Sequence, residues 1–194
     1  MLFVTLSSFV NAQDSIPKKQ TTFEKFTSVT GYIVKYNDYK LPDVVGKHGS
    51  GLLAVYNTVH ASVREVVIGN DRSLFLRLTY QENPNKRERI AFIAYEDVVE
   101  IEKALNELVK QSESEISSKI DYVENKFRTK DDFNLGYYIR TNRNKKNEII
   151  GNEMVWFMNL DETLYNSTTF FQQSSLLTDL FTNALSKMEE LGAR

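Results

Sequence analysis

The side chains that most often carry out catalysis are few in this sequence. It contains two histidines, His48 and His60, which are twelve positions apart, and no cysteine. A helical zinc site needs two histidines at i and i+4 with a glutamate between them, and thiol chemistry needs a cysteine. We therefore interpret His48 as an exposed loop residue and His60 as a strand residue with one bonded ring nitrogen. We expect no metal ion and no cofactor.

A glycine-rich segment, Gly46–Gly51, comes closest to a phosphate-binding loop. A P-loop places a lysine directly after its last glycine, between a strand and a helix. Here Lys47 precedes the second glycine, and the sequence that follows is typical of a strand. The segment is therefore predicted to be a mobile connection between strands, and such a connection can still gate a pocket.

Adjacent carboxylates occur at Glu96-Asp97, Asp131-Asp132 and Asp161-Glu162. Neighbouring acidic residues point apart or cap turns more often than they share a cleft, so turn or cap roles are expected. The sequence has no Gly-x-Ser-x-Gly nucleophile elbow. A non-catalytic protein is therefore favoured, and the alternative is a hydrolase-type enzyme that uses carboxylate and tyrosine side chains.

An aromatic and basic stretch is the best candidate for a binding site. Tyr137 and Tyr138 are followed by Arg140 and Arg143, and Lys145-Lys146 extends the basic run. Tyrosine offers a rigid apolar ring with a polar tip, and the cations suit an anionic glycan or a phospholipid head group. We predict ligand binding at Tyr137, Tyr138, Arg140 and Arg143. The alternative is a solvated turn that keeps edge strands from pairing with a neighbour.

Strands and two helices are expected to position these residues. Asp97 is the predicted N-cap of the first helix, because the apolar residues that follow it recur at helical spacing up to Leu108. Residues 111–119 are rich in serine and glutamate and are predicted to be a linker. A second helix is expected after Ser174 or Ser175, ending before Gly192. Period-2 alternation and β-branched runs predict strands at 32–37, 52–56, 59–68, 74–80, 90–95, 122–128, 133–141, 154–158 and 168–172.

These elements define an α+β fold with antiparallel sheet and two amphipathic helices. Each helix follows a group of strands, which favours two structurally related strand-strand-strand-helix halves at 23–112 and 119–192. Residue identity between the two groups is low. The alternative is therefore that a chain of this length contains two such groups by chance.

The N-terminus predicts export. Leu2–Val10 is apolar and uncharged, and it is followed by the small residue Ala12 and then by polar residues from Gln13 onward. This pattern is typical of a secretory signal peptide. We predict a signal peptide at 1–12, a flexible leader at 13–22 and a single domain at 23–194, in the periplasm or outside a bacterial cell. A buried N-terminal strand is the alternative.

Charge and hydropathy limit the class of partner. The 194 residues include 24 basic and 26 acidic side chains, for a net charge of -2. A nucleic-acid-binding protein needs a strong positive field, which this balance does not provide. No stretch approaches the ~20 apolar residues of a membrane-spanning helix. The expected partner is therefore an unidentified protein or small ligand, bound by an exported binding module or an envelope structural module.

Overall fold

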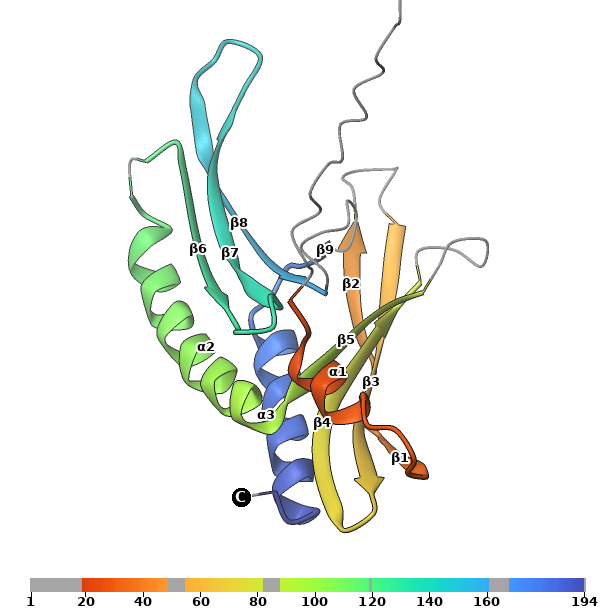
Figure 1. Ribbon diagram of the computed structural model, residues 1–194. Coiled ribbons are helices and arrows are strands. Elements are labelled where there is room, and N and C mark those ends of the chain that lie inside the picture. Colours follow the sequence, from red (N-terminus) through yellow and green to blue (C-terminus); the bar gives the residue numbers. More distant parts are fainter. Residues whose placement is uncertain (1–18, 49–54, 82–87, 119, 161–167, 194) are drawn as a thin grey trace, which may run out of the picture.

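The computed structural model describes residues 19–48, 55–81, 88–118, 120–160 and 168–193. Within these residues one nine-stranded antiparallel sheet is combined with three helices, two of them long (Figure 1). The predicted α+β class is confirmed. The predicted signal peptide and residues 13–18 of the predicted leader lie outside the described residues.

The helices are α1 (Thr22–Thr27), α2 (Tyr95–Glu115) and α3 (Ser175–Glu190). The strands are β1 (Val34–Lys40), β2 (Val44–His48), β3 (Val55–Ile68), β4 (Asp71–Tyr80), β5 (Arg89–Ala94), β6 (Tyr122–Arg128), β7 (Asn134–Arg143), β8 (Ile149–Asn159) and β9 (Thr168–Phe171).

The chain crosses the sheet in two passes. The strand order is β5-β4-β3-β2-β9-β8-β7-β6, and β1 also pairs with β3. The first pass therefore runs from the centre of the sheet at β2 to one edge at β5. Helix α2 then leads to the opposite edge at β6, and the second pass returns to the centre at β9. A structural relation between the halves 23–112 and 119–192 stays a prediction.

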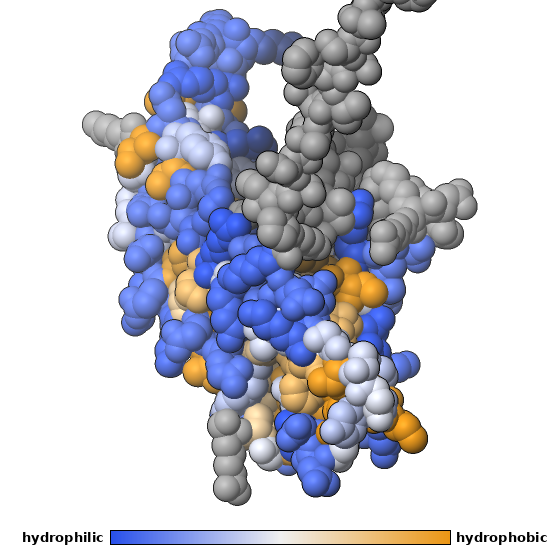
Figure 2. Space-filling model, viewed as in Figure 1, coloured by the Kyte–Doolittle hydropathy of each residue, from blue (hydrophilic) through white to orange (hydrophobic). Residues whose placement is uncertain are grey.

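The β7–β8 hairpin projects beyond the rest of the second strand group (Figure 1). It pairs from Asn134 opposite Asn159 to Arg143 opposite Ile149, with a register shift after Asn142. In Figure 2 the end of this hairpin is hydrophilic, and hydrophobic side chains lie just below it. This projecting end contains part of the predicted ligand site.

Helix α2 differs from its prediction at both ends. Its N-cap is Ala94, and Asp97 lies inside the first turn with its buried carboxylate 3.9 Å from the Lys130 ammonium. The helix continues to Glu115, so the predicted linker at 111–119 was wrong over its first five residues. The reason is tertiary packing: Ser112 is buried and bonds the carbonyl of Val109 at 2.7 Å, so this polar segment still presents one residue to the core.

Strand β2 occupies the first part of the segment that was predicted to be a mobile connection. Its neighbour β9 approaches it closely, because a Cβ atom built on Gly46 would lie 2.9 Å from the carbonyl oxygen of Phe170. Only glycine leaves room for this approach. The glycine at position 46 therefore serves strand packing, while 49–51 lie outside the described residues.

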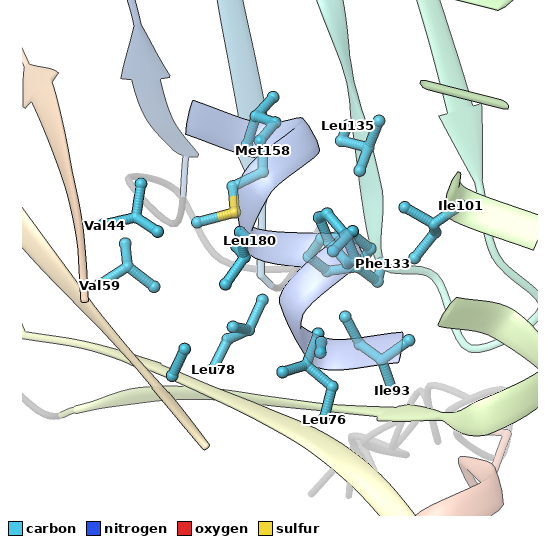
Figure 3. Close-up of a cluster of buried hydrophobic side chains, with 14 of the residues drawn as sticks. Val44, Val59, Leu76, Leu78, Ile93, Ile101, Phe133, Leu135, Met158 and Leu180 are labelled. Carbon is cyan, nitrogen blue, oxygen red and sulfur yellow. The ribbon is translucent and has the colours of Figure 1, made fainter. Parts of the chain in front are cut away.

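The main core lies between the sheet and helices α2 and α3 (Figure 3). Each helix presents a buried stripe at helical spacing, as predicted. The stripes and the sheet residues they meet are fully or almost fully buried, and they include Val59, Leu76, Leu78, Ile93, Ile101, Leu105, Leu135, Met158, Leu177, Leu180 and Phe181.

The opposite face of the first strand group is covered by α1. Phe23 stacks on Phe92 at 3.7 Å between ring centroids and meets Phe75 edge-on at 5.1 Å. A capping box between Thr21 and Glu24 starts this helix. The corresponding face of the second strand group carries no helix in the described part of the chain (Figure 1).

Candidate functional site

Tyr137 lies on the helix-facing side of β7 and is completely buried. Its hydroxyl donates to Glu115 Oε2 and accepts from Asn125 Nδ2, both at 2.8 Å. Burial, together with the bond to Glu115, raises the pKa of the Tyr137 phenol to about 12. This residue therefore connects the end of α2 to β6 and lies inside the protein.

Tyr138 lies on the other face of β7, because successive side chains of a strand alternate. Its ring stacks on Tyr122 with 6.0 Å between centroids and meets Phe170 edge-on at 6.3 Å. Desolvation raises the pKa of the Tyr138 phenol. Tyr122 is 54% exposed, so this aromatic pair borders an open surface that Tyr137 does not share.

The two predicted arginines hold ion pairs. Arg140 donates two bonds to Glu153 on the neighbouring strand, at 2.9 and 2.7 Å. Arg143 donates to Asp121 at 2.7 Å and to the carbonyl of Asn147 at 3.0 Å. Arg140 therefore shares the face of Tyr138, and Arg143 fixes the base of the hairpin turn to the residue before β6.

The turn at the hairpin end is well defined by its own hydrogen bonds. The N–H of Asn147 donates to the carbonyl of Asn144 at 2.9 Å, and Asn147 adopts a positive φ of 64°. The Asn144 side chain also accepts from the N–H groups of Lys146 and Glu148. Asparagine suits both positions, because it bonds to its own backbone and tolerates the left-handed region. Lys145 and Lys146 consequently occupy the central positions of the turn.

Neither lysine has an ion-pair partner among the described residues, and both are exposed. Two isoleucines follow the turn, and they are 61% (Ile149) and 66% (Ile150) exposed. Ile120, which is 51% exposed, lies beside the hairpin because its carbonyl accepts from the Thr141 hydroxyl. We name this surface the hairpin patch, and it consists of Ile120, Lys145, Lys146, Ile149 and Ile150.

The isoleucines of the hairpin patch were not predicted as site residues, although the sequence carries a signal. Ile149 and Ile150 are adjacent at the start of a strand. Residues directly next to a polar hairpin turn lie at the end of the hairpin, where a core does not cover them. An apolar pair beside a basic turn therefore indicates exposed apolar surface.

A separate pocket lies between the β1–β2 connection and α3. It has a volume of about 210 Å³, and Asp43 and Asp179 line it from its two walls together with Leu41, Pro42, Val44, Leu176, Leu180 and Asn183. Nδ1 of His60 lies 2.9 Å from the Asp43 carboxylate. The bonded ring nitrogen agrees with the interpretation of His60 as a strand residue. His48 lies in β2, not in a loop as expected.

The other carboxylate pairs have structural positions where they are described. Asp132 adopts a φ of 70° in the turn before β7 and pairs with Arg128 at 3.0 Å, and Asp131 accepts from the N–H of Thr22 at 2.7 Å. Residues 161–162 lie outside the described residues. In the part of the chain that the structure describes, no three His, Asp or Glu side chains form a group that could hold a metal ion.

None of the described helices is both long enough and apolar enough to cross a membrane. The sequence matches no protein-family model, and no curated protein is significantly similar to it.

Proposed function

We propose that this protein is an exported, non-catalytic binding module that contacts its partner through the hairpin patch. The observation that carries the proposal is the exposure of Ile149 and Ile150 beside two lysines that lack ion-pair partners among the described residues. Exposed apolar side chains gathered at one place, next to charged residues, are typical of interaction sites. The signal-type pattern of residues 1–12 supports export.

Of the predicted ligand residues, Arg143 lies beside this surface, and Arg140 and Tyr138 lie further along β7. Arg143 anchors the turn that presents the lysines, and Tyr122 and Tyr138 extend the exposed area along the sheet. The proposal assigns Tyr137 no contact with a partner, because its hydroxyl is used inside the protein.

A hydrolase-type enzyme is the second candidate function, and the pair formed by His60 and Asp43 favours it. A carboxylate that bonds one ring nitrogen of a histidine can orient the other nitrogen as a general base. Asp43 also lines the pocket beside α3. The pair is however largely exposed, with 62% and 46% of the two side chains accessible, so water competes with any substrate there.

Binding to the envelope fraction of the source organism tests the binding module. Ile150→Asp places a charge in the hairpin patch, and Ile33→Asp is the matched control, because Ile33 is an exposed isoleucine (89%) next to β1. We expect the purified protein to sediment with envelopes, the Ile150 variant to lose at least about tenfold in affinity, and the control to be unchanged. Equal binding by all three proteins would contradict the proposal.

The second candidate is tested separately with His60→Ala and a panel of ester and peptide substrates. Turnover that disappears in this variant, and persists in Ile150→Asp, would favour the enzyme over the binding module.

A further inference from the structure

We propose that the partner of the hairpin patch is the surface of an anionic phospholipid membrane. This inference rests on the proposed function, because it names the chemical class that the same surface binds. Its first support is charge. The segment 140–153 carries four basic and two acidic side chains, in a chain whose net charge is negative. Lys145 and Lys146 lie in the turn that ends the projecting hairpin, and this end is hydrophilic in Figure 2, so the two lysines meet a flat anionic surface first.

The second support is that two of these cations form ion pairs within the protein and two do not. Arg140 and Arg143 are occupied by Glu153 and Asp121, so they shape the hairpin. Lys145 and Lys146 occupy the central positions of the turn, and no described side chain pairs with them. A lysine ammonium on a long apolar stem can contact lipid phosphates while its stem lies against the acyl boundary.

The third support is the place of the apolar residues. Ile149 and Ile150 follow the lysines by three residues or more, and Ile149 pairs with Arg143 just below the turn. When the hairpin end lies against a bilayer, the two lysines can reach lipid phosphates on their long stems while the exposed isoleucines enter the interfacial region. Because the turn projects, it offers no walls to surround a discrete ligand.

Two other classes of partner could use part of the hairpin patch, and the experiment must distinguish them from a membrane. A soluble anionic polysaccharide would use the lysines without the isoleucines, and an apolar protein surface would use the isoleucines without a requirement for anionic lipid. The membrane requires both sets at once, since the head groups attract the lysines and the interface takes up the isoleucines.

The experiment measures cosedimentation of the purified exported protein with vesicles. Phosphatidylcholine vesicles that contain phosphatidylglycerol are compared with vesicles of phosphatidylcholine alone. We expect binding to the anionic vesicles only. Lys145→Glu combined with Lys146→Glu should weaken it by about 25-fold or more, because each lysine near an anionic surface contributes about fivefold. Added salt should weaken the binding of the unaltered protein.

Two controls make the test specific. Lys35→Glu combined with Lys40→Glu changes the net charge by the same amount on β1, where both lysines are exposed and have no ion-pair partner among the described residues. This variant should bind within about twofold of the unaltered protein. Ile149→Ser combined with Ile150→Ser leaves the charge unchanged and should weaken binding by roughly tenfold. Unaltered thermal unfolding of all variants confirms that they are folded.

Three results would overturn the inference. The first is equal binding to neutral and anionic vesicles, and the second is equal loss in the β1 control. The third is binding to a soluble anionic polysaccharide that needs the lysines but not the isoleucines. If the vesicles bind nothing while envelope fractions still bind through Ile150, the membrane inference fails and the proposed binding module stands. If envelopes also bind nothing, both fail.

Discussion

At the scale of single residues, Tyr137 and Tyr138 show how one step along a strand separates two roles. Tyr137 faces the helices and completes a buried hydrogen-bond network with Glu115 and Asn125. Tyr138 faces the other way and packs against aromatic rings near an open surface. The sequence placed both residues in one candidate site, because two adjacent tyrosines give no indication of which face is covered.

Removal of the Tyr137 hydroxyl should destabilise the protein. In Tyr137→Phe, Glu115 and Asn125 keep their mutual bond at 2.8 Å but lose the phenol, so we expect the free energy of unfolding to fall by ~1 kcal/mol. Tyr138→Phe is the matched control on the other face, because no described side chain forms a hydrogen bond with its hydroxyl. Urea unfolding measures both. An equal loss in the two variants would contradict the assigned roles.

The same residue predicts a dependence on alkaline pH. The pKa of Tyr137 is raised from 10.0 to about 12 in the folded protein, so folding favours its neutral form. This contribution to stability is complete below about pH 10 and is lost as the pH rises towards 12, with a slope of up to ~1.4 kcal/mol per pH unit. Tyr137→Phe should lack this slope, which urea unfolding at pH 9 to 11 would reveal. An unchanged slope would show that the phenol titrates normally.

At the scale of the elements, the buried stripe of α2 predicts a large effect for one leucine. Leu105 is completely buried between α2 and the sheet, so Leu105→Ala should cost ~2–5 kcal/mol of unfolding free energy. Leu185 on α3 is only partly buried at the edge of the same cluster, and Leu185→Ala should cost less, about 1 kcal/mol. Thermal unfolding would test the order. A smaller loss for Leu105 than for Leu185 would mean that the two helices pack differently.

The helices and strands also show which element bounds can be predicted from local sequence pattern. The bounds of β6 were predicted as observed, because alternation from Tyr122 to Arg128 lies between turn-forming residues. The second helix was also predicted close to its observed range, because its apolar residues recur at helical spacing between a serine and a glycine. Its N-cap is Ser174. By contrast, β2 packs against Phe170, and the last turn of α2 is held by the bond between Glu115 and Tyr137. Both contacts join residues that are distant in sequence. Composition alone gives these segments the character of loops.

The candidate site was predicted in part. The basic turn and Arg140 and Arg143 were identified from residue type, and Arg143 does lie at the base of the turn. The exposed isoleucines were not predicted as candidate site residues, because their exposure is seen only once the hairpin is placed in the fold. The pairing of His60 with Asp43 was also missed, since it depends on β2 and β3 lying side by side.

At the scale of the whole molecule, one sheet carries two surfaces that different experiments can separate. Helices α2 and α3 cover one face, and α1 covers part of the other. The β7–β8 hairpin, which carries the hairpin patch, projects from the second strand group (Figure 1). The pocket of Asp43 lies against α3. A partner that binds one of these surfaces leaves the other open, so protection from solvent distinguishes them.

Hydrogen–deuterium exchange of the purified protein, with and without envelope membranes of the source organism, tests most directly whether the hairpin patch is the binding surface. The account predicts slower exchange on binding at the hairpin end, residues 141–150, and unchanged exchange at 41–44 and 176–183, which line the pocket. Slower exchange at the pocket segments, with the hairpin end unchanged, would contradict it.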